Sequence, residues 1–209
     1  MIAMHIHHAL AQVHELKMRV INAQRFTGYS GRCRIVGGTL AILAPFVLRA
    51  SWYPQTPAAH LAGWGFVLAA SVIANYAAVL YWFLFSPEAR RDVRRLMPTA
   101  YALPSLAVGG TLTVALIRLG AYDALFGTWM CLLGLTNLSS RQVLPRALWP
   151  LGLFYIGCGT VCLFWPGVSF TNPWPMGAVF GVGEWIGGFI FHYNRMPSTT
   201  LPGGFFQRT

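Results

Sequence analysis

The stretch WPMGAVFGVGEWIGGFIFH, residues 174–192, decides the fold class of this chain. It is apolar and long enough to cross the hydrocarbon core of a bilayer as one helix, which takes about 20 residues. Its midpoint carries a carboxylate, Glu184. Because an ionised carboxylate is costly in hydrocarbon, an acid at this depth is a functional-site candidate.

Glycines surround this acid on two helix faces. Gly177, Gly181 and Gly188 are spaced so that they share one face with Glu184, and Gly183 and Gly187 form a second pair beside it. Small residues allow another helix to approach closely, so we expect Glu184 to point at protein rather than at lipid. Two interpretations stay open: a hydrogen bond that packs helices without any turnover, or a functional acid.

The composition is that of an integral membrane protein. Of the 209 residues, 56% are hydrophobic and only 10% are charged, against roughly 25% charged residues in soluble domains. The net charge is +10, from 15 basic and 5 acidic residues. Nucleic-acid binding is disfavoured because no recognisable module carries a clustered basic face. A concentration of basic residues in cytoplasmic loops explains the charge better.

The apolar runs predict an all-α integral membrane protein with six transmembrane helices. We expect the spans at about residues 35–48, 61–85, 102–119, 124–138, 147–165 and 174–192. The chain then divides into an N-terminal cytoplasmic segment, 1–31, a six-helix membrane domain, 32–195, and a flexible cytoplasmic tail, 196–209. Within the first segment, residues 4–26 have the three-to-four spacing of an amphipathic helix.

The basic residues also predict the orientation. With both termini in the cytoplasm, every lysine and arginine except Arg49 and Arg118 lies on the cytoplasmic side. The charge bias and short loops fit a bacterial inner membrane, although the rule is not confined to bacteria. One short segment between spans concentrates arginines that suit either lipid headgroups or ordinary topology determination, namely Arg90, Arg91, Arg94 and Arg95.

A short motif recurs in the first and third expected spans. Residues 36–40 and 108–112 both read VGGTL, and residues 157–161 read GCGTV. The recurrence predicts three helical hairpins on one plan, but short matches also arise by chance in helices rich in Gly and Thr. If the repeat is real, its glycines let the odd spans pack together at the centre, and its threonines bond to their own helix or to a neighbour. The glycines concerned are Gly37, Gly38, Gly109 and Gly110.

The sequence predicts no cofactor. Haem is disfavoured because only His60 and His192 come near spans, at opposite membrane faces, and retinal is excluded because the only lysine, Lys17, lies outside every span. No CxxC pair suggests zinc, and the cluster of His5, His7 and His8 is weak evidence for a metal. P-loop, HExxH and GxSxG motifs are absent.

Three functions remain. The first is an accessory or scaffold subunit, which binds other membrane subunits or itself through Gly-rich helix faces and otherwise contacts only the lipid bilayer. The alternative is a small-solute or proton-coupled transporter or channel, with Glu184 and Asn75 as polar groups at mid-depth. A membrane enzyme acting on lipid is disfavoured because no nucleophile and base pair is visible.

Overall fold

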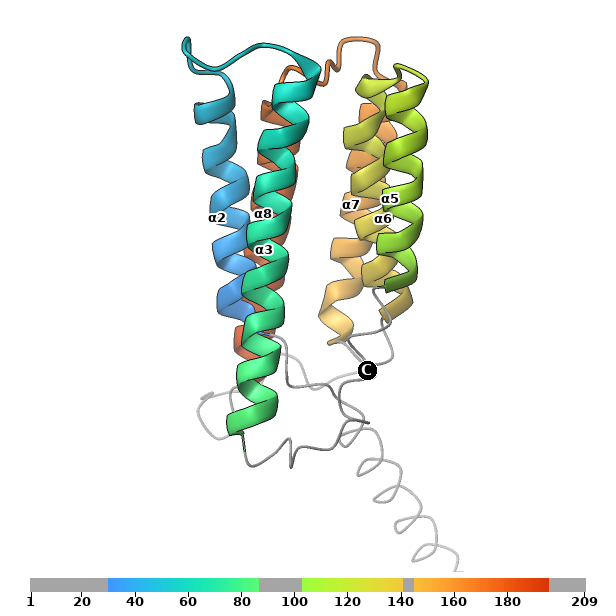
Figure 1. Cartoon of the computed structure of the whole chain (residues 1–209). Coiled ribbons are helices and arrows are strands. Elements are labelled where there is room, and N and C mark those ends of the chain that lie inside the picture. Colours follow the sequence, from blue (N-terminus) through green and yellow to red (C-terminus); the bar gives the residue numbers. More distant parts are fainter. Residues whose placement is uncertain (1–29, 87–102, 141–144, 196–209) are drawn as a thin grey trace, which may run out of the picture.

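The chain folds into a bundle of helices, seen in a computed structural model that describes residues 30–86, 103–140 and 145–195 (Figure 1). Two 3₁₀ turns, η2 (Tyr122–Ala124) and η4 (Arg146–Leu148), precede α6 and α7. The six long helices are α2 (Gly31–Leu48), α3 (Pro57–Phe85), α5 (Leu103–Arg118), α6 (Leu125–Ser139), α7 (Trp149–Phe164) and α8 (Trp174–Arg195). The all-α fold class is therefore confirmed for these residues. The amphipathic N-terminal helix, the four-arginine segment, the histidine cluster and the C-terminal tail lie outside them.

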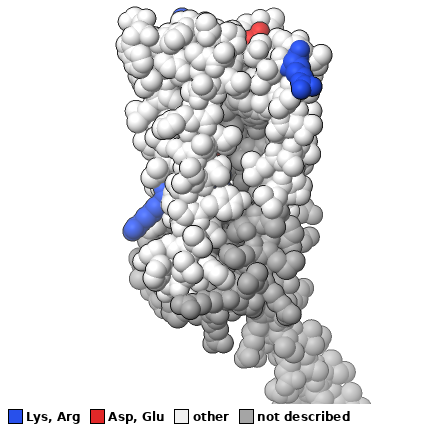
Figure 2. Space-filling view, viewed as in Figure 1, with Lys and Arg blue, Asp and Glu red and all other residues white. Residues whose placement is uncertain are grey.

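Three helical stretches are long and apolar enough to cross a membrane: Gly31–Leu48, Pro57–Phe85 and Arg146–Phe164. Leu103–Arg118 is a shorter apolar helix. Large apolar side chains on these helices are exposed, Phe66 to 72% and Phe164 to 82%. Figure 2 shows one face that is almost free of charged side chains. Such a surface is stable in contact with lipid, so the chain is an integral membrane protein. Six spans and their orientation stay predictions.

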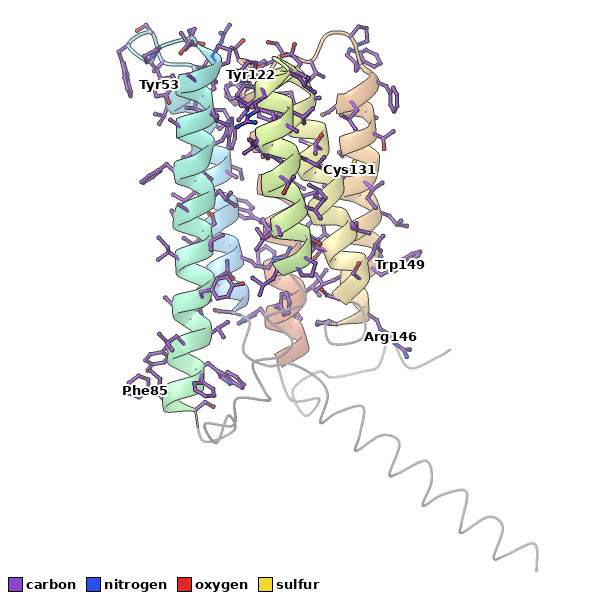
Figure 3. The ribbon with its side chains drawn as sticks, turned by 45° about the vertical axis from the view of Figure 1, so that its right-hand side comes forward. Tyr53, Phe85, Tyr122, Cys131, Arg146 and Trp149 are labelled. Atoms are coloured by element: carbon purple, nitrogen blue, oxygen red, sulfur yellow. The ribbon has the colours of Figure 1, made fainter. Side chains whose placement is uncertain are left out.

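Local sequence sets the helix ends. Thr56 caps α3 by accepting a hydrogen bond from the backbone N–H of Ala59 at 3.3 Å, and Pro57 takes the first helical position. Gly120 has a φ of 71°, which lets the chain turn sharply after α5. Aromatic side chains lie toward both ends of the bundle, Tyr53 and Tyr122 at one end and Phe85 and Trp149 toward the other (Figure 3).

The helices form two groups that lie side by side (Figure 1). α2, α3 and α8 make one group, and α5, α6 and α7 make the other. The most extensive contacts are those of α2 with α8 and of α6 with α7, whereas α7 and α8 connect the groups by a smaller contact. α3 and α5 share at most a marginal contact. The space-filling view is hollowed between the two groups (Figure 2).

Glycines bring α2 and α8 together in an antiparallel pair. A Cβ atom added at Gly38 would lie 3.0 Å from the carbonyl oxygen of Gly181, and one at Gly188 would lie 2.7 Å from that of Gly31. Residues 31 and 38 are seven apart, as are 181 and 188, so the same face recurs after two helical turns. Only helices without side chains at these points can approach so closely.

The same register recurs in α6 and α7. A Cβ at Gly159 would lie 2.7 Å from the carbonyl oxygen of Gly127, and one at Gly134 would lie 2.6 Å from that of Gly152. The spacing is again seven residues in both helices. In each pair a branched apolar side chain four residues beyond a glycine covers the opposite glycine; these side chains are Ile35, Ile42, Ile156 and Leu163.

The helices of the first, third and fifth spans are α2, α5 and α7. They do not pack together at the centre of the bundle, so that expectation is wrong. α2 packs on α8, and α7 packs on α6, while α2, α5 and α7 share at most marginal contacts with one another. The expectation for the threonines is confirmed. Thr39, Thr111 and Thr160 each donate to the carbonyl oxygen four residues earlier, and Thr39 also accepts a bond from the Trp185 indole at 3.2 Å.

A core of apolar side chains fills one end of the bundle. Trp64, Phe126 and Phe170 are at most 4% exposed, and the Phe126 ring lies 4.8 Å from the Phe170 ring. Asp123 accepts a bond from the backbone N–H of Phe170 at 2.7 Å, which ties the turn before α6 to the loop before α8. A smaller cluster around Leu148, Leu151, Tyr155 and Phe191 lies on α7 and α8 and in η4 before them.

We predict that Gly159→Ala destabilises the fold while Gly157→Ala does not. The methyl group at position 159 would meet the Cys131 sulfur and the Gly127 carbonyl oxygen, each at 2.7 Å, whereas position 157 has no atom within 4 Å. Overpacking of this kind costs about 1–3 kcal/mol. Thermal unfolding in detergent, followed by circular dichroism, measures both variants. Equal melting temperatures would contradict the close contact of α6 and α7.

Candidate functional site

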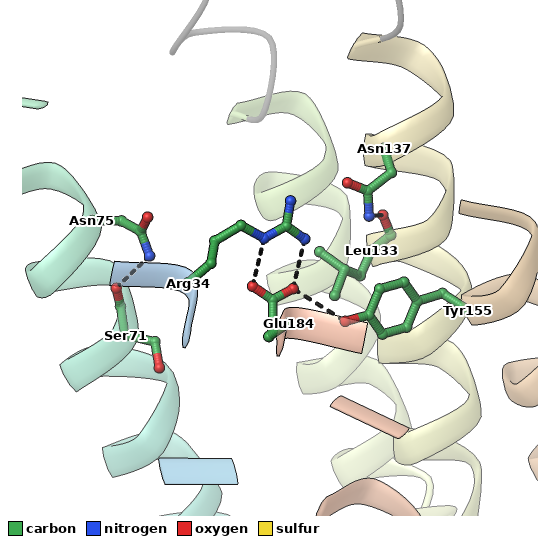
Figure 4. A network of polar contacts seen from close by, with 7 residues as sticks. All are labelled: Arg34, Ser71, Asn75, Leu133, Asn137, Tyr155 and Glu184. Carbon is green, nitrogen blue, oxygen red and sulfur yellow. Dashed lines mark hydrogen bonds and ion pairs between the residues drawn. The ribbon is translucent and has the colours of Figure 1, made fainter. Parts of the chain in front are cut away.

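The strongest polar cluster of the described residues surrounds Glu184 (Figure 4). Arg34 donates from Nε to Oε2 and from Nη2 to Oε1 of Glu184, both at 2.8 Å. Tyr155 donates its hydroxyl to Oε1 at 3.1 Å. The three side chains come from α2, α8 and α7, so one carboxylate joins three helices and both helix groups. We call these three residues the Glu184 cluster.

The side chains of the Glu184 cluster are little exposed at the surface of the protein. The side chains of Arg34 and Glu184 are 11% and 18% exposed, and Tyr155 is fully buried. A fork of two parallel bonds between guanidinium and carboxylate is the strongest geometry of such a pair. The Arg34 guanidinium also lies 5.6 Å from the centre of the Phe191 ring, within range of a cation–π interaction.

Two glycines of α8 make room for this cluster. A Cβ at Gly183 would collide with the Tyr155 hydroxyl, and one at Gly187 would lie 2.7 Å from Cζ of Arg34. Their spacing predicted a second helix-packing pair. In the structure each borders a polar side chain that bonds to the acid between them.

The remaining glycines named from the sequence lie mostly in contacts within the chain. Gly177 packs on Pro45 and on the Ala41 carbonyl, which has lost its usual bond because Pro45 has no N–H. A Cβ at Gly37 would touch Ser71 of α3 at 3.0 Å, and one at Gly109 would touch Leu132 of α6 at 3.3 Å. A Cβ at Gly110 would have no atom of the described residues within 4 Å.

Asn75 does not share a contact with Glu184 in the described part of the chain. Its amide donates to the carbonyl oxygen of Ser71, one turn earlier on α3, at 3.0 Å (Figure 4). Asn137 bonds in the same way to the carbonyl oxygen of Leu133 at 3.1 Å. Whether Asn75 and Glu184 serve one path stays a prediction.

A second polar spot lies near the start of α3. His60 is fully buried, and its Nδ1 lies 3.1 Å from the Thr56 carbonyl oxygen, so this nitrogen is the donor. Among the residues that the structure describes, neither its Nε2 nor the indole N–H of Trp64 has a hydrogen-bond partner. In the described ranges no group of three metal-ligating side chains occurs, and His192 is exposed near the far end of α8.

Sequence reasoning missed Arg34 and Tyr155. Arg34 was assigned to the flank of a span beginning at residue 35, but α2 begins at Gly31 and places Arg34 inside the helix. The signal was available, because an acid at membrane depth needs a positive partner and few cations border the expected spans. Tyr155 had no such signal, since a tyrosine in an apolar helix is ordinary.

The cluster can hold and orient charge, but it has no set of groups for covalent catalysis. Within the described ranges the other acid is Asp123, which belongs to the loop contact with Phe170. The class of protein is thus a helical integral membrane protein with a partly buried ion pair. The chain matches no known family model, no characterised protein and no solved structure.

We predict that Glu184→Gln lowers stability by about 3 kcal/mol, because it leaves the Arg34 guanidinium enclosed without its counter-charge. The double variant Arg34→Gln with Glu184→Gln removes both charges and should be more stable than the single variant. Reversible unfolding in detergent tests the pair as a double-mutant cycle. Additive effects in that cycle would mean that the two side chains are not coupled.

Proposed function

We propose that this protein is an accessory or scaffold subunit that spans the membrane six times, with both termini in the cytoplasm, and binds another membrane helix along the edge formed by α3 and α5. The single observation that carries the proposal is the open position of Gly110 on α5. The glycines that hold the third place of the other two motif copies, Gly38 and Gly159, are both buried against a helix.

The three motif copies support this assignment. In the first copy the second and third motif positions contact different helices, since Gly37 touches α3 and Gly38 touches α8, and in the last copy the third position, Gly159, touches α6. In the remaining copy Gly109 touches α6, the next helix of its own hairpin, and Gly110 touches none of the residues that the structure describes. Three hairpins on one plan would therefore leave one of three equivalent contacts unfilled, at the α3–α5 edge.

The burial of the edge helices agrees with an unfilled contact. α5 has no buried residue, and α3, with 29 residues, buries only His60, Trp64 and Val79. An apolar helix face is compatible with lipid, so exposure alone does not argue for a partner. Gly110 does indicate one, because a glycine contributes little to lipid contact and much to close helix packing.

We predict that Gly110→Leu breaks the complex and Gly157→Leu preserves it. Both glycines are exposed, lie in apolar helices and would place a Cβ with no atom of the described ranges within 4 Å. Only Gly110 occupies the third motif position. Extraction in mild detergent followed by native mass spectrometry measures the partner or copy that travels with each variant. Retention of the complex by Gly110→Leu would remove this edge as the contact surface.

A second candidate function is transport of a small solute or of protons, and the Glu184 cluster favours it. The cluster lies where the two helix groups meet, and α2·α8 and α6·α7 have the same packing register. Transporters built from repeats place their charged sites at the junction of the repeats. An accessory subunit needs no charge there.

We predict that, if the protein transports, Glu184→Gln abolishes flux and Tyr155→Phe only reduces it, because the phenylalanine keeps the ion pair. Proteoliposomes with an internal pH dye measure proton movement, and protease resistance of the inserted protein serves as the control for folding. Undiminished flux in Glu184→Gln liposomes would exclude this carboxylate as the transport group.

A further inference from the structure

We propose that the Glu184 cluster is a binding site for a planar guanidinium-type cation, which Arg34 fills in this structure and which a free cation of the same class fills when Arg34 leaves. The inference rests on the second candidate function and names its solute class.

The shape of the site is that of guanidinium recognition. Both oxygens of Glu184 accept from one guanidinium plane at 2.8 Å, and the Phe191 ring lies 5.6 Å from its central carbon. A carboxylate fork selects a planar cation with parallel N–H bonds, and an aromatic face adds a cation–π attraction. An ammonium ion offers one point of charge and matches the fork less well.

Gly187 and Tyr155 shape the site on either side of the Glu184 carboxylate. Gly187 gives the guanidinium its space, since a methyl group there would lie 2.7 Å from Cζ of Arg34. Tyr155 donates to Oε1 from the opposite side at 3.1 Å and is itself fully buried. A buried phenol that fixes the acid keeps it oriented when the cation departs.

Arg34 is placed where it can leave. It follows the first residue of α2, Gly31, by three positions, which is about 4.5 Å along the helix axis. An arginine so near a helix end can extend its long stem toward the membrane surface and take its charge there. The free cation would then approach Glu184 from the same end of the bundle.

The site takes one positive charge at a time. The two acids of the described ranges are Glu184 and Asp123, and Asp123 bonds to the Phe170 backbone in a different part of the bundle. Arg34 and a free cation therefore compete for one carboxylate. Removal of the Arg34 side chain should open the site, and a methyl group at position 187 should close it again.

Equilibrium dialysis of radiolabelled guanidinium against the full-length protein in detergent tests the proposal. Concentrations from about 0.05 to 20 mM are suitable, because a ligand of four heavy atoms binds no more tightly than roughly 50 μM. Sodium chloride keeps the ionic strength constant. We expect Arg34→Ala to bind one guanidinium per chain, and the wild type to bind it about tenfold more weakly because Arg34 competes intramolecularly.

The control variants share the Arg34→Ala background. Adding Glu184→Gln should abolish guanidinium binding. Adding Gly187→Ala should weaken binding at least about tenfold, because the methyl group would occupy the space of the guanidinium. Adding Gly157→Ala should leave binding unchanged. If Arg34→Ala fails to fold, guanidinium binding is measured with the wild type and with Glu184→Gln. Saturable binding to the wild type that is lost in Glu184→Gln would then support the site.

The possible results distinguish failure of the guanidinium site from failure of the transport function. Binding to Arg34→Ala but none to the wild type at 20 mM would overturn displacement and make Arg34 a fixed structural partner. No binding to a folded Arg34→Ala would overturn the site. Proton flux that depends on Glu184 without any guanidinium binding would retain transport and reject this solute class. Binding without flux of labelled guanidinium in proteoliposomes would retain the site and reject transport.

Discussion

The close antiparallel contact between glycine-bearing helices is the constraint on which the rest of this structure depends. Lipid is as apolar as a leucine side chain, so burial of apolar surface gives little reason for helices to associate within a bilayer. Backbones that approach closely gain dispersion contacts and weak Cα–H···O bonds instead. In α2·α8 and α6·α7 the glycines are seven residues apart on both partners, so each pair is fixed in register as well as in distance.

The ion pair follows from that register. Gly31 against Gly188 and Gly38 against Gly181 place the third residue after Gly31 beside the middle of α8. Arg34 therefore meets Glu184 with both its fork bonds formed. Tyr155 reaches the same carboxylate from α7 and makes the acid the polar link between the two helix groups. Burial of an ion pair costs desolvation free energy, and apolar side chains at the same positions would join the helices without that cost. The charge therefore calls for a functional explanation.

Much of the fold was predictable because apolar runs are local properties of sequence. The expected spans at 61–85 and 124–138 differ from α3 and α6 by at most four residues at either end. The glycine face around Glu184 was also predictable from helical spacing. Which helix it packs on was not, because Gly31 and Gly188 are far apart in sequence and their pairing is decided only in the assembled bundle. The same separation hid Arg34 from the sequence analysis, since the pair joins residues 150 positions apart.

An open glycine is not by itself a contact surface, as the chain shows. Gly65 and Gly157 also have no atom within 4 Å, yet neither stands at the third motif position. Gly110 differs from them because its counterparts, Gly38 and Gly159, each receive the backbone of an antiparallel helix. A partner at α5 would have to run antiparallel to it and present a small residue there. α3 runs in that direction along the same edge but carries large exposed side chains, including Phe66 and Ile73, seven residues apart. Side chains of that size prevent the close approach made by α8 and α6, so α3 is poorly suited to close the edge, and this is why we propose that another chain does so.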